Sequence, residues 1–378
     1  MHRSGSRSPD VVIVGGGVIG CACAWELARN GVRTVVLERS VPGAEASSAA
    51  AGLLGAHIES EEPGPMAELC RKSAGRYPSF ARRLKEETEI DVEYRRCGIL
   101  SVAFRHEALA ALQREYAWQI RAGFRVEKRD AAALLRAEPG LGRKLAGGLC
   151  FEDDARVDPR RLLTALHLAA AKRGVGFQSG TYVRRVLAGE GTARGVELED
   201  GSRLLAGHVV IAAGSWTTLI DGLDMPERSV IPARGQIIEL QAETKLRHVV
   251  FGPHCYLVPR DDGRVLVGST LEFVGYKKQV TAAAAHRLLG AAIRLVPALG
   301  GATLSGHWSN FRPYTPDRLP LLGATSVPRT LLATGHFRTG ILLAPITAEI
   351  IGALVRGKRP PLSLEPFEPR RRRTGREN

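Results

Sequence analysis

Near the N-terminus of the chain, a short apolar run leads directly into glycines. Residues 10–14 (DVVIV) are largely β-branched, as in a strand buried in a parallel sheet. Residues 15–20 (GGGVIG) follow at once, and the next segment is typical of a helix that ends at Gly31. A second run at residues 33–37 (RTVVL) predicts another strand. The pattern therefore predicts a βαβ unit.

The glycines of this unit have a spacing typical of dinucleotide sites. Gly15, Gly17 and Gly20 give GxGxxG. The first permits a tight turn, the second lets the backbone approach a pyrophosphate, and the third lets helix and strand pack closely. The helix N-terminus adds N–H donors and positive potential. Glu38 follows the second strand, where a carboxylate accepts hydrogen bonds from ribose hydroxyls and repels a 2′-phosphate, which argues against NADP.

Segments of a similar kind lie farther along the chain. Residues 47–55 (SSAAAGLLG) are small and would let an extended ligand lie close to the backbone. Three further strands are expected near residues 181–187, 195–199 and 208–212. The last leads into a turn at Gly214, and residues 331–342 (LLATGHFRTGIL) predict another glycine-bearing turn from strand to helix. Elements at both ends of the chain favour a long cofactor such as FAD over NAD.

A hairpin is expected in the second half of the chain. Residues 254–258 (HCYLV) alternate as a strand, so His254, Tyr256 and Val258 share one face. A turn at residues 261–263 (DDG) and a returning strand at residues 265–269 complete the hairpin. One face would form a pocket wall, although a tyrosine in a strand more often serves sheet packing alone.

Arg312 stands in an aromatic setting, beside Trp308, Phe311, Pro313 and Tyr314. A lone arginine is usually a surface residue. These neighbours instead suggest a desolvated guanidinium, which suits two parallel hydrogen bonds to a carboxylate.

Length and composition limit the classes to which the protein can belong. A chain of 378 residues exceeds a typical single domain, so two lobes are expected. Six cysteines without framework spacing predict reduced thiols in a cytoplasmic protein. The first ten residues lack the apolar core of a signal peptide. The longest apolar region, near residues 11–28, contains glycines and Glu26, so we expect no membrane span.

The formal charge of +14 has two interpretations. Four of these charges come from the run at residues 370–373, and the remainder would attract anionic ligands such as a pyrophosphate or a carboxylate. The alternative is nucleic-acid binding. Because the chain has no recognition-helix signature and no basic stripe interleaved with aromatic residues, we do not expect nucleic acid as a partner.

The sequence resembles the D-amino-acid oxidase family, and within it the bacterial glycine oxidases of thiamine biosynthesis. The resemblance runs over nearly all of residues 10–355. It is most specific at residues 47–59 (SSAAAGLLGAHIE), 254–260 (HCYLVPR), 311–323 (FRPYTPDRLPLLG) and 335–345 (GHFRTGILLAP).

The resemblance implies an α/β (α+β) fold with a Rossmann-like FAD-binding domain and a second, substrate domain built on a large antiparallel sheet. We assign residues 10–85, 150–225 and 311–365 to the FAD-binding domain and residues 86–149 and 226–310 to the substrate domain. Residues 1–9 and the basic tail at residues 366–378 are expected to be disordered.

Roles follow by matching position. Arg312 corresponds to the arginine that pairs with the substrate carboxylate, Tyr256 to a tyrosine that helps to hold it, and His254 and Arg338 to pocket positions. The expected cofactor-binding residues are Gly15, Gly17, Val18, Ile19, Gly20, Glu38, Arg39, Ser47, Ala51, Gly52, Leu53, Val183, Gly214, His336, Phe337, Arg338, Thr339, Gly340, Ile341 and Leu342. The chain departs from the expected pattern at Leu271, where we expect methionine in relatives, which leaves the preferred substrate open. No cysteine follows Cys255, so we expect FAD to be bound non-covalently.

The implied reaction is oxidation of glycine or another small amino acid or secondary amine. Hydride passes from Cα to FAD, and the resulting imine is hydrolysed by water. O2 then reoxidises the reduced FAD and becomes hydrogen peroxide. The cofactor carries this chemistry, so no side chain is assigned as a general base. No metal site is expected. Two alternatives stay open: a flavin dehydrogenase of D-amino acids that uses a quinone or partner acceptor, and an RNA-associated tRNA-modifying flavin oxidase. The oligomeric state also stays open.

Overall fold

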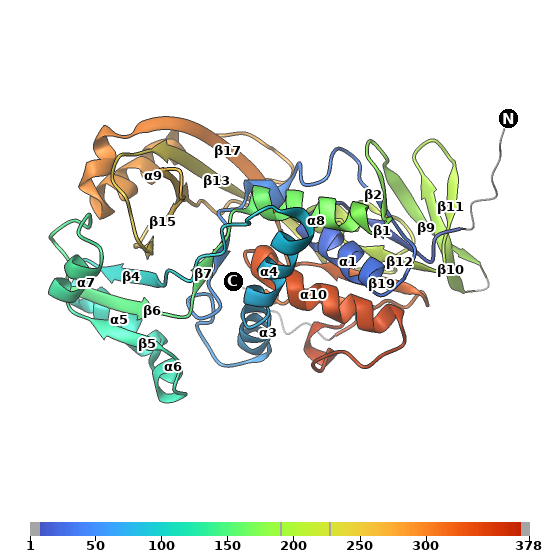
Figure 1. Cartoon of the computed structure of the whole chain (residues 1–378), viewed down its shortest axis with the longest axis horizontal. Coiled ribbons are helices and arrows are strands. Elements are labelled where there is room, and N and C mark those ends of the chain that lie inside the picture. Colours follow the sequence, from blue (N-terminus) through green and yellow to red (C-terminus); the bar gives the residue numbers. More distant parts are fainter. Residues whose placement is uncertain (1–7, 190, 227, 372–378) are drawn as a thin grey trace.

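A computed structural model of the chain describes residues 8–189, 191–226 and 228–371. The expectations for residues 1–7 and 372–378 lie outside this range. Two large sheets stand at opposite ends of an elongated molecule (Figure 1). One belongs to the expected cofactor-binding half and the other to the expected substrate half, so the mixed α/β fold predicted from the sequence is confirmed.

The first sheet has six strands in the order β18-β19-β12-β1-β2-β8. Neighbouring strands pair in parallel except β18 with β19. The strands are β1 (Val11–Val14), β2 (Thr34–Leu37), β8 (Gly176–Gln178), β12 (His208–Ile211), β18 (Leu321–Ala324) and β19 (Thr330–Thr334). The predicted βαβ unit is therefore confirmed, with α1 (Val18–Arg29) between β1 and β2.

Both faces of this sheet are covered, which explains why every residue of β1 is apolar. Val11 and Ile13 face a core shared with helices, whereas Val12 and Val14 face a small three-stranded sheet. The helices are α1, α3 (Pro65–Ala74), α4 (Tyr77–Thr88), α8 (Pro159–Lys172) and α10 (Gly340–Val355). The small sheet comprises β9 (Val183–Gly189), β10 (Thr192–Leu198) and β11 (Arg203–Leu205).

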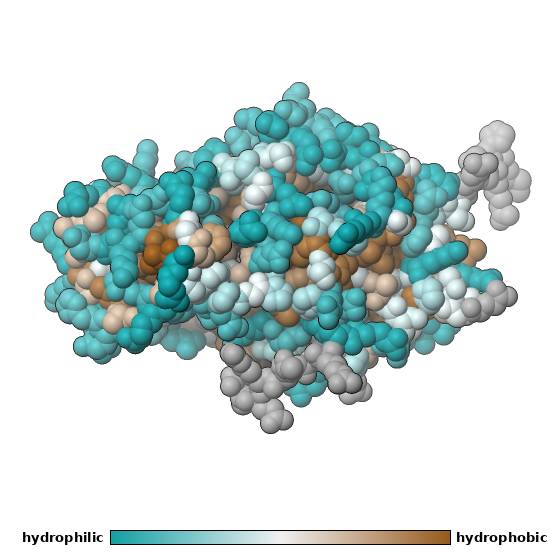
Figure 2. All heavy atoms as spheres, turned by 90° about the horizontal axis from the view of Figure 1, so that it is seen from below, coloured by the Kyte–Doolittle hydropathy of each residue, from teal (hydrophilic) through white to brown (hydrophobic). Residues whose placement is uncertain are grey.

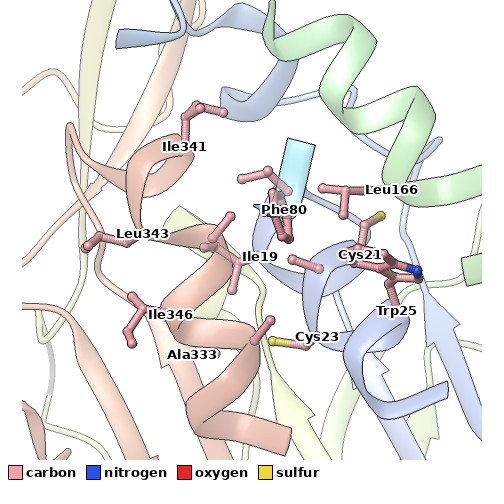
Figure 3. Close-up of a cluster of buried hydrophobic side chains, with 14 of the residues drawn as sticks. Ile19, Cys21, Cys23, Trp25, Phe80, Leu166, Ala333, Ile341, Leu343 and Ile346 are labelled. Carbon is pink, nitrogen blue, oxygen red and sulfur yellow. The ribbon is translucent and has the colours of Figure 1, made fainter. Parts of the chain in front are cut away.

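Helices α1 and α10 pack against each other in the core that Val11 and Ile13 face, between the six-stranded sheet and its helices. We call it the helix-side core. Figure 3 shows Ile19 and Cys23 of α1 beside Leu343 and Ile346 of α10. Trp25, on the far side of α1, packs edge-to-face against Phe80 with ring centroids 5.4 Å apart. This packing fixes the N-termini of two helices, each preceded by a glycine-bearing turn.

The second sheet has eight strands in the order β17-β13-β16-β15-β14-β4-β6-β5. Its pairs are antiparallel except β14 with β4, so the expected large antiparallel sheet is present with one parallel pair. The strands are β4 (Ile99–Ala103), β5 (Val126–Arg129), β6 (Gly147–Phe151), β13 (Ile231–Gln241), β14 (Val249–Phe251), β15 (Tyr256–Pro259), β16 (Arg264–Gly268) and β17 (Thr303–Tyr314).

The remaining helices and strands complete the fold. Helices α5 (His106–Glu115), α6 (Ala117–Arg121), α7 (Ala131–Ala137) and α9 (Ala282–Leu295) accompany the second sheet, and α2 (Ala46–Ala49) and the pair β3 (Leu53–Leu54) and β7 (Ala155–Arg156) lie between the halves. Three 3-10 helices are η1 (Gly214–Leu219), η2 (Pro297–Gly301) and η3 (Glu365–Phe367). The domain boundaries expected at 149/150 and 310/311 fall inside β6 and β17 of the eight-stranded sheet.

The expectation of a disordered tail is wrong for residues 366–371. Phe367 is 1% exposed and joins the helix-side core. Arg371 pairs with Asp317, with 2.8 Å between Nε and Oδ2, and donates to the carbonyl oxygens of Leu319 and Pro320. An aromatic ring and a guanidinium with several acceptors hold this segment, although its composition suggested a solvated tail.

The described residues include no helix long and apolar enough to cross a membrane. Seen from below, the surface is largely hydrophilic, and apolar side chains form separate small areas (Figure 2).

Candidate cofactor and substrate site

The turn after β1 requires its glycines. Gly15 has φ of +109°, and a Cβ there would lie 2.5 Å from the carbonyl oxygen of Ala212. A Cβ on Gly20 would lie 1.9 Å from the carbonyl oxygen of Gly15. Both positions are therefore restricted to glycine by backbone contacts, as expected for the close packing of β1, α1 and β12.

Two side chains from other segments hold the start of α1. The Val18 N–H donates to Ser47 Oγ at 2.9 Å, and a Cβ on Gly17 would stand 3.1 Å from the same oxygen. The buried Glu38 carboxylate accepts from the Gly16 N–H at 2.7 Å and from the Ser40 N–H at 3.0 Å. Glu38 is thus fixed beside the glycine turn at the end of β2.

Next to Glu38, Arg39 has two partners. Its guanidinium carbon lies 3.7 Å from the ring centroid of Trp216 in η1, a cation–π geometry. The same guanidinium pairs with Glu45, with 2.6 Å between Nη2 and Oε1. Arg39 therefore connects the end of β2 with η1 and with the segment before α2.

Arg312 of β17 occupies the other end of the site. It donates to Ser269 Oγ at 2.6 Å and to the Thr270 carbonyl at 3.1 Å. A Cβ on Gly235 would lie 2.1 Å from Arg312 Nη1, so the guanidinium lies flat on a glycine of β13. Burial lowers the pKa of Arg312, while the neighbouring Tyr256 opposes that shift. An arginine remains charged despite such a shift.

The turn between β19 and α10 contributes two adjacent side chains. His336 is buried, with Nε2 3.0 Å from Thr347 Oγ1, and burial lowers its pKa to about 3, so the imidazole is neutral. Phe337 has φ of +48°, and its N–H donates to the carbonyl of Pro313 at 3.0 Å. The turn is thereby tied to the strand end that carries Arg312.

These elements enclose one cavity of about 490 Å³. Every predicted site residue lines it except Gly20, which packs under the glycine turn. His254, Tyr256, Arg312 and Arg338 are therefore brought together with the glycine turn, Glu38 and the residues 336–342. Leu271, the position at which we expect relatives to differ, is 43% exposed and does not line the cavity.

Sequence reasoning missed several lining residues, among them Glu59, Trp216, Cys255 and Ser269. Glu59 ends the motif at residues 47–59, in which Ser47, Ala51, Gly52 and Leu53 were assigned to the cofactor. Its place in that motif is the signal that could have identified it. Cys255 is buried, and burial raises the pKa of its thiol to about 12. A thiol so rarely ionised is a poor nucleophile for attachment to a flavin.

The geometry fits FAD. The backbone at Gly17, the carboxylate of Glu38 and the N-termini of α1 and α10 border the same cavity that Arg312 lines. Within the described ranges, no group of three or more His, Cys, Asp and Glu side chains could hold a metal ion.

Comparisons with known proteins agree with this geometry. The chain is 39% identical over 370 residues to the bifunctional protein ThiO/ThiG of Synechocystis sp., covering 96% of this chain and 54% of that protein. It is 35% identical over 363 residues to glycine oxidase of Geobacillus kaustophilus, covering 95% and 96%. A crystal structure of glycine oxidase from Geobacillus kaustophilus matches with a TM-score of 0.92 at 34% identity, over 97% of this chain and 100% of that chain.

The chain spans about half the length of the bifunctional relatives. The model of the DAO family, described as FAD dependent oxidoreductase, matches residues 10–354. The chain therefore belongs to the DAO family of FAD dependent oxidoreductases.

Proposed function

We propose that this protein oxidatively deaminates glycine or another small amino acid or secondary amine, with FAD as cofactor and O2 as electron acceptor. The observation that carries the proposal is Arg312, a desolvated cation in the cavity that also contains the glycine turn. The similarity to glycine oxidases supports the same substrate class.

FAD, when bound, supplies the acceptor for the hydride that leaves the substrate Cα. The chain's own residues would position the substrate. Arg312 makes two hydrogen bonds to protein acceptors, and since a guanidinium has five N–H donors, others are left for a carboxylate. Tyr256 lies beside Arg312, where its hydroxyl would donate to the same carboxylate. Fixing the carboxylate in this way orients Cα.

No protein base is assigned to the reaction. His336, the buried histidine of the site, is neutral and bonded to Thr347. His254 also lines the cavity but is exposed to solvent. The electron pair of the neutral substrate amine suffices to drive loss of the hydride, after which water hydrolyses the imine.

A substrate panel tests the proposal. FAD-loaded protein should produce hydrogen peroxide in air with at least one of glycine, sarcosine, N-ethylglycine, D-alanine and D-proline. Substrate-dependent reduction of a dye without peroxide would instead indicate a dehydrogenase. Inactivity with the whole panel, together with tRNA binding that weakens steeply with salt, would favour the tRNA-modifying alternative.

The setting of the enzyme belongs to the same proposal. All six cysteines are free, which supports a reducing compartment such as the cytoplasm. The bifunctional ThiO/ThiG relatives support a place in thiamine biosynthesis.

A further inference from the structure

Glu59 stands on a turn that buried side chains hold in place. Asp154, which is 0% exposed, accepts from the N–H groups of His57 and Ile58, both at 3.0 Å. The same carboxylate lies 2.9 Å from His57 Nδ1. A carboxylate buried so completely is favourable only because these partners satisfy it, so this pairing fixes the backbone just before Glu59.

The turn is also held by α6 and the residue before it. The Tyr116 hydroxyl donates to the Ile58 carbonyl at 2.6 Å. The amide of Gln119, which is 0% exposed, donates to the carbonyls of His57 and Ser60, both at 2.7 Å. Three polar side chains from outside the turn therefore set the direction of Glu59, whose side chain lines the cavity.

Within the cavity, the Glu59 carboxylate has a charge partner but an open hydrogen-bonding capacity. Arg338 Nη1 lies 3.7 Å from Glu59 Oε2, longer than a charge-assisted hydrogen bond. Among the residues that the structure describes, none donates a hydrogen bond to this carboxylate, and Arg338 is its ion-pair partner. Burial raises the pKa of Glu59. The positive charges of Arg338 and Arg312 oppose this shift, whereas the negative charges of Glu61 and Asp154 add to it.

The charges match a small amino acid. Around Arg312, two cations, Arg312 and Arg338, line the cavity together with the Glu59 carboxylate on which both act. A substrate carboxylate held on Arg312 carries its amino group on the adjacent carbon. That amino group has N–H donors in both its neutral and its charged form, and Glu59 is an acceptor with an unfilled position.

We propose that Glu59 binds the substrate's amino group and thereby selects amino acids over other small carboxylates. This inference rests on the proposed function. Glu59 distinguishes substrates by what stands at Cα: an N–H donor is accepted, whereas a simple carboxylate lacks the partner that Glu59 requires, and a second carboxylate there is repelled.

The test compares an amino acid with an anion that lacks the amino group. Glu59→Leu removes the acceptor, and Glu59→Gln keeps a neutral one. Glu62→Gln is the matched control, because Glu62 is an exposed acid of the same segment that does not line the cavity and is not among the charges that shift the pKa of Glu59. Flavin absorbance of each variant reports folding and FAD content. Glycine and sarcosine kinetics are measured beside inhibition by acetate.

Glu59→Leu should lower kcat/KM for glycine roughly ten- to hundredfold, as expected for a hydrogen bond to a charged group. Glu59→Gln should lose less, and Glu62→Gln should match the wild type. Acetate should inhibit the Glu59 variants as well as the wild type or better, because a negative charge near the anion has gone.

Two results would overturn the inference. One is a Glu59→Leu enzyme within threefold of the wild type for glycine. The other is a parallel loss of acetate inhibition, which would make Glu59 only a support for the arginines. Wild-type protein inactive with every amino acid would refute the proposed function and this inference together, whereas active wild type with unaffected variants would refute this inference alone.

Discussion

Replacing Arg312 with alanine removes the cation on which the substrate site is built. The guanidinium lies on Gly235, is held by Ser269 and Thr270, and is desolvated enough that its pKa falls. A carboxylate paired in such a place by two hydrogen bonds contributes about 2–5 kcal/mol, including the cost of leaving it unpaired. Arg312→Ala should therefore lower kcat/KM for amino acids by roughly two to three orders of magnitude.

The assay is peroxide production with glycine and sarcosine, together with the flavin spectrum of each variant. Arg312→Lys should recover only part of the loss, because a point charge cannot reproduce a planar fork. Arg287→Ala, at an exposed position of α9, is the control and should be fully active. Carboxylate inhibitors such as glycolate should weaken in parallel, and an amine without a carboxylate should be affected much less. FAD-replete Arg312→Ala enzyme with near wild-type efficiency would refute the assignment.

Further predictions concern the cofactor and the fold. Gly17→Val should lower FAD affinity at least about tenfold in titrations, since even a Cβ crowds Ser47 Oγ at 3.1 Å; normal affinity would contradict this. Acid precipitation should release the flavin, and colour retained in the pellet would refute non-covalent binding. Because the pKa of His336 falls from 6.5 to about 3 on folding, unfolding takes up a proton at acidic pH. Between about pH 6.5 and pH 3, the free energy of unfolding measured with urea should fall by about 1.4 kcal/mol more per unit of decreasing pH in the wild type than in His336→Gln. Equal slopes would exclude this. Arg371→Ala should lower the free energy of unfolding by about 2–4 kcal/mol, whereas Arg370→Ala, at an exposed position, should leave it almost unchanged. Equal effects of the two substitutions would mean that the pair with Asp317 does not stabilise the fold.

Local signals sufficed for the cofactor-binding elements. The glycine turn after residue 14, the helix that follows and the hairpin around Tyr256 depend on neighbouring residues, so periodicity and turn chemistry predicted them. The large antiparallel sheet was expected from a resemblance, which did not give its eight strands. Its parallel pair joins Val249 to Ile99, and no local pattern encodes a pairing over that separation.

The same distinction applies to the site. Arg312 and Tyr256 stand in distinctive motifs, and both line the cavity. Glu59 depends on Asp154 and Gln119, which hold its turn from distant parts of the chain. The packing of Phe367 and the pair between Arg371 and Asp317 likewise appear only in the folded chain, which is why basic composition gave the wrong expectation for that segment.

The most direct test of the central claim is to mix FAD-loaded protein with glycine, and separately with sarcosine, in the absence of oxygen. At least one of these compounds should abolish the visible flavin absorbance, and admission of air should restore it with formation of one hydrogen peroxide for each substrate consumed. A flavin spectrum that neither compound nor any other small amino acid changes would contradict the account.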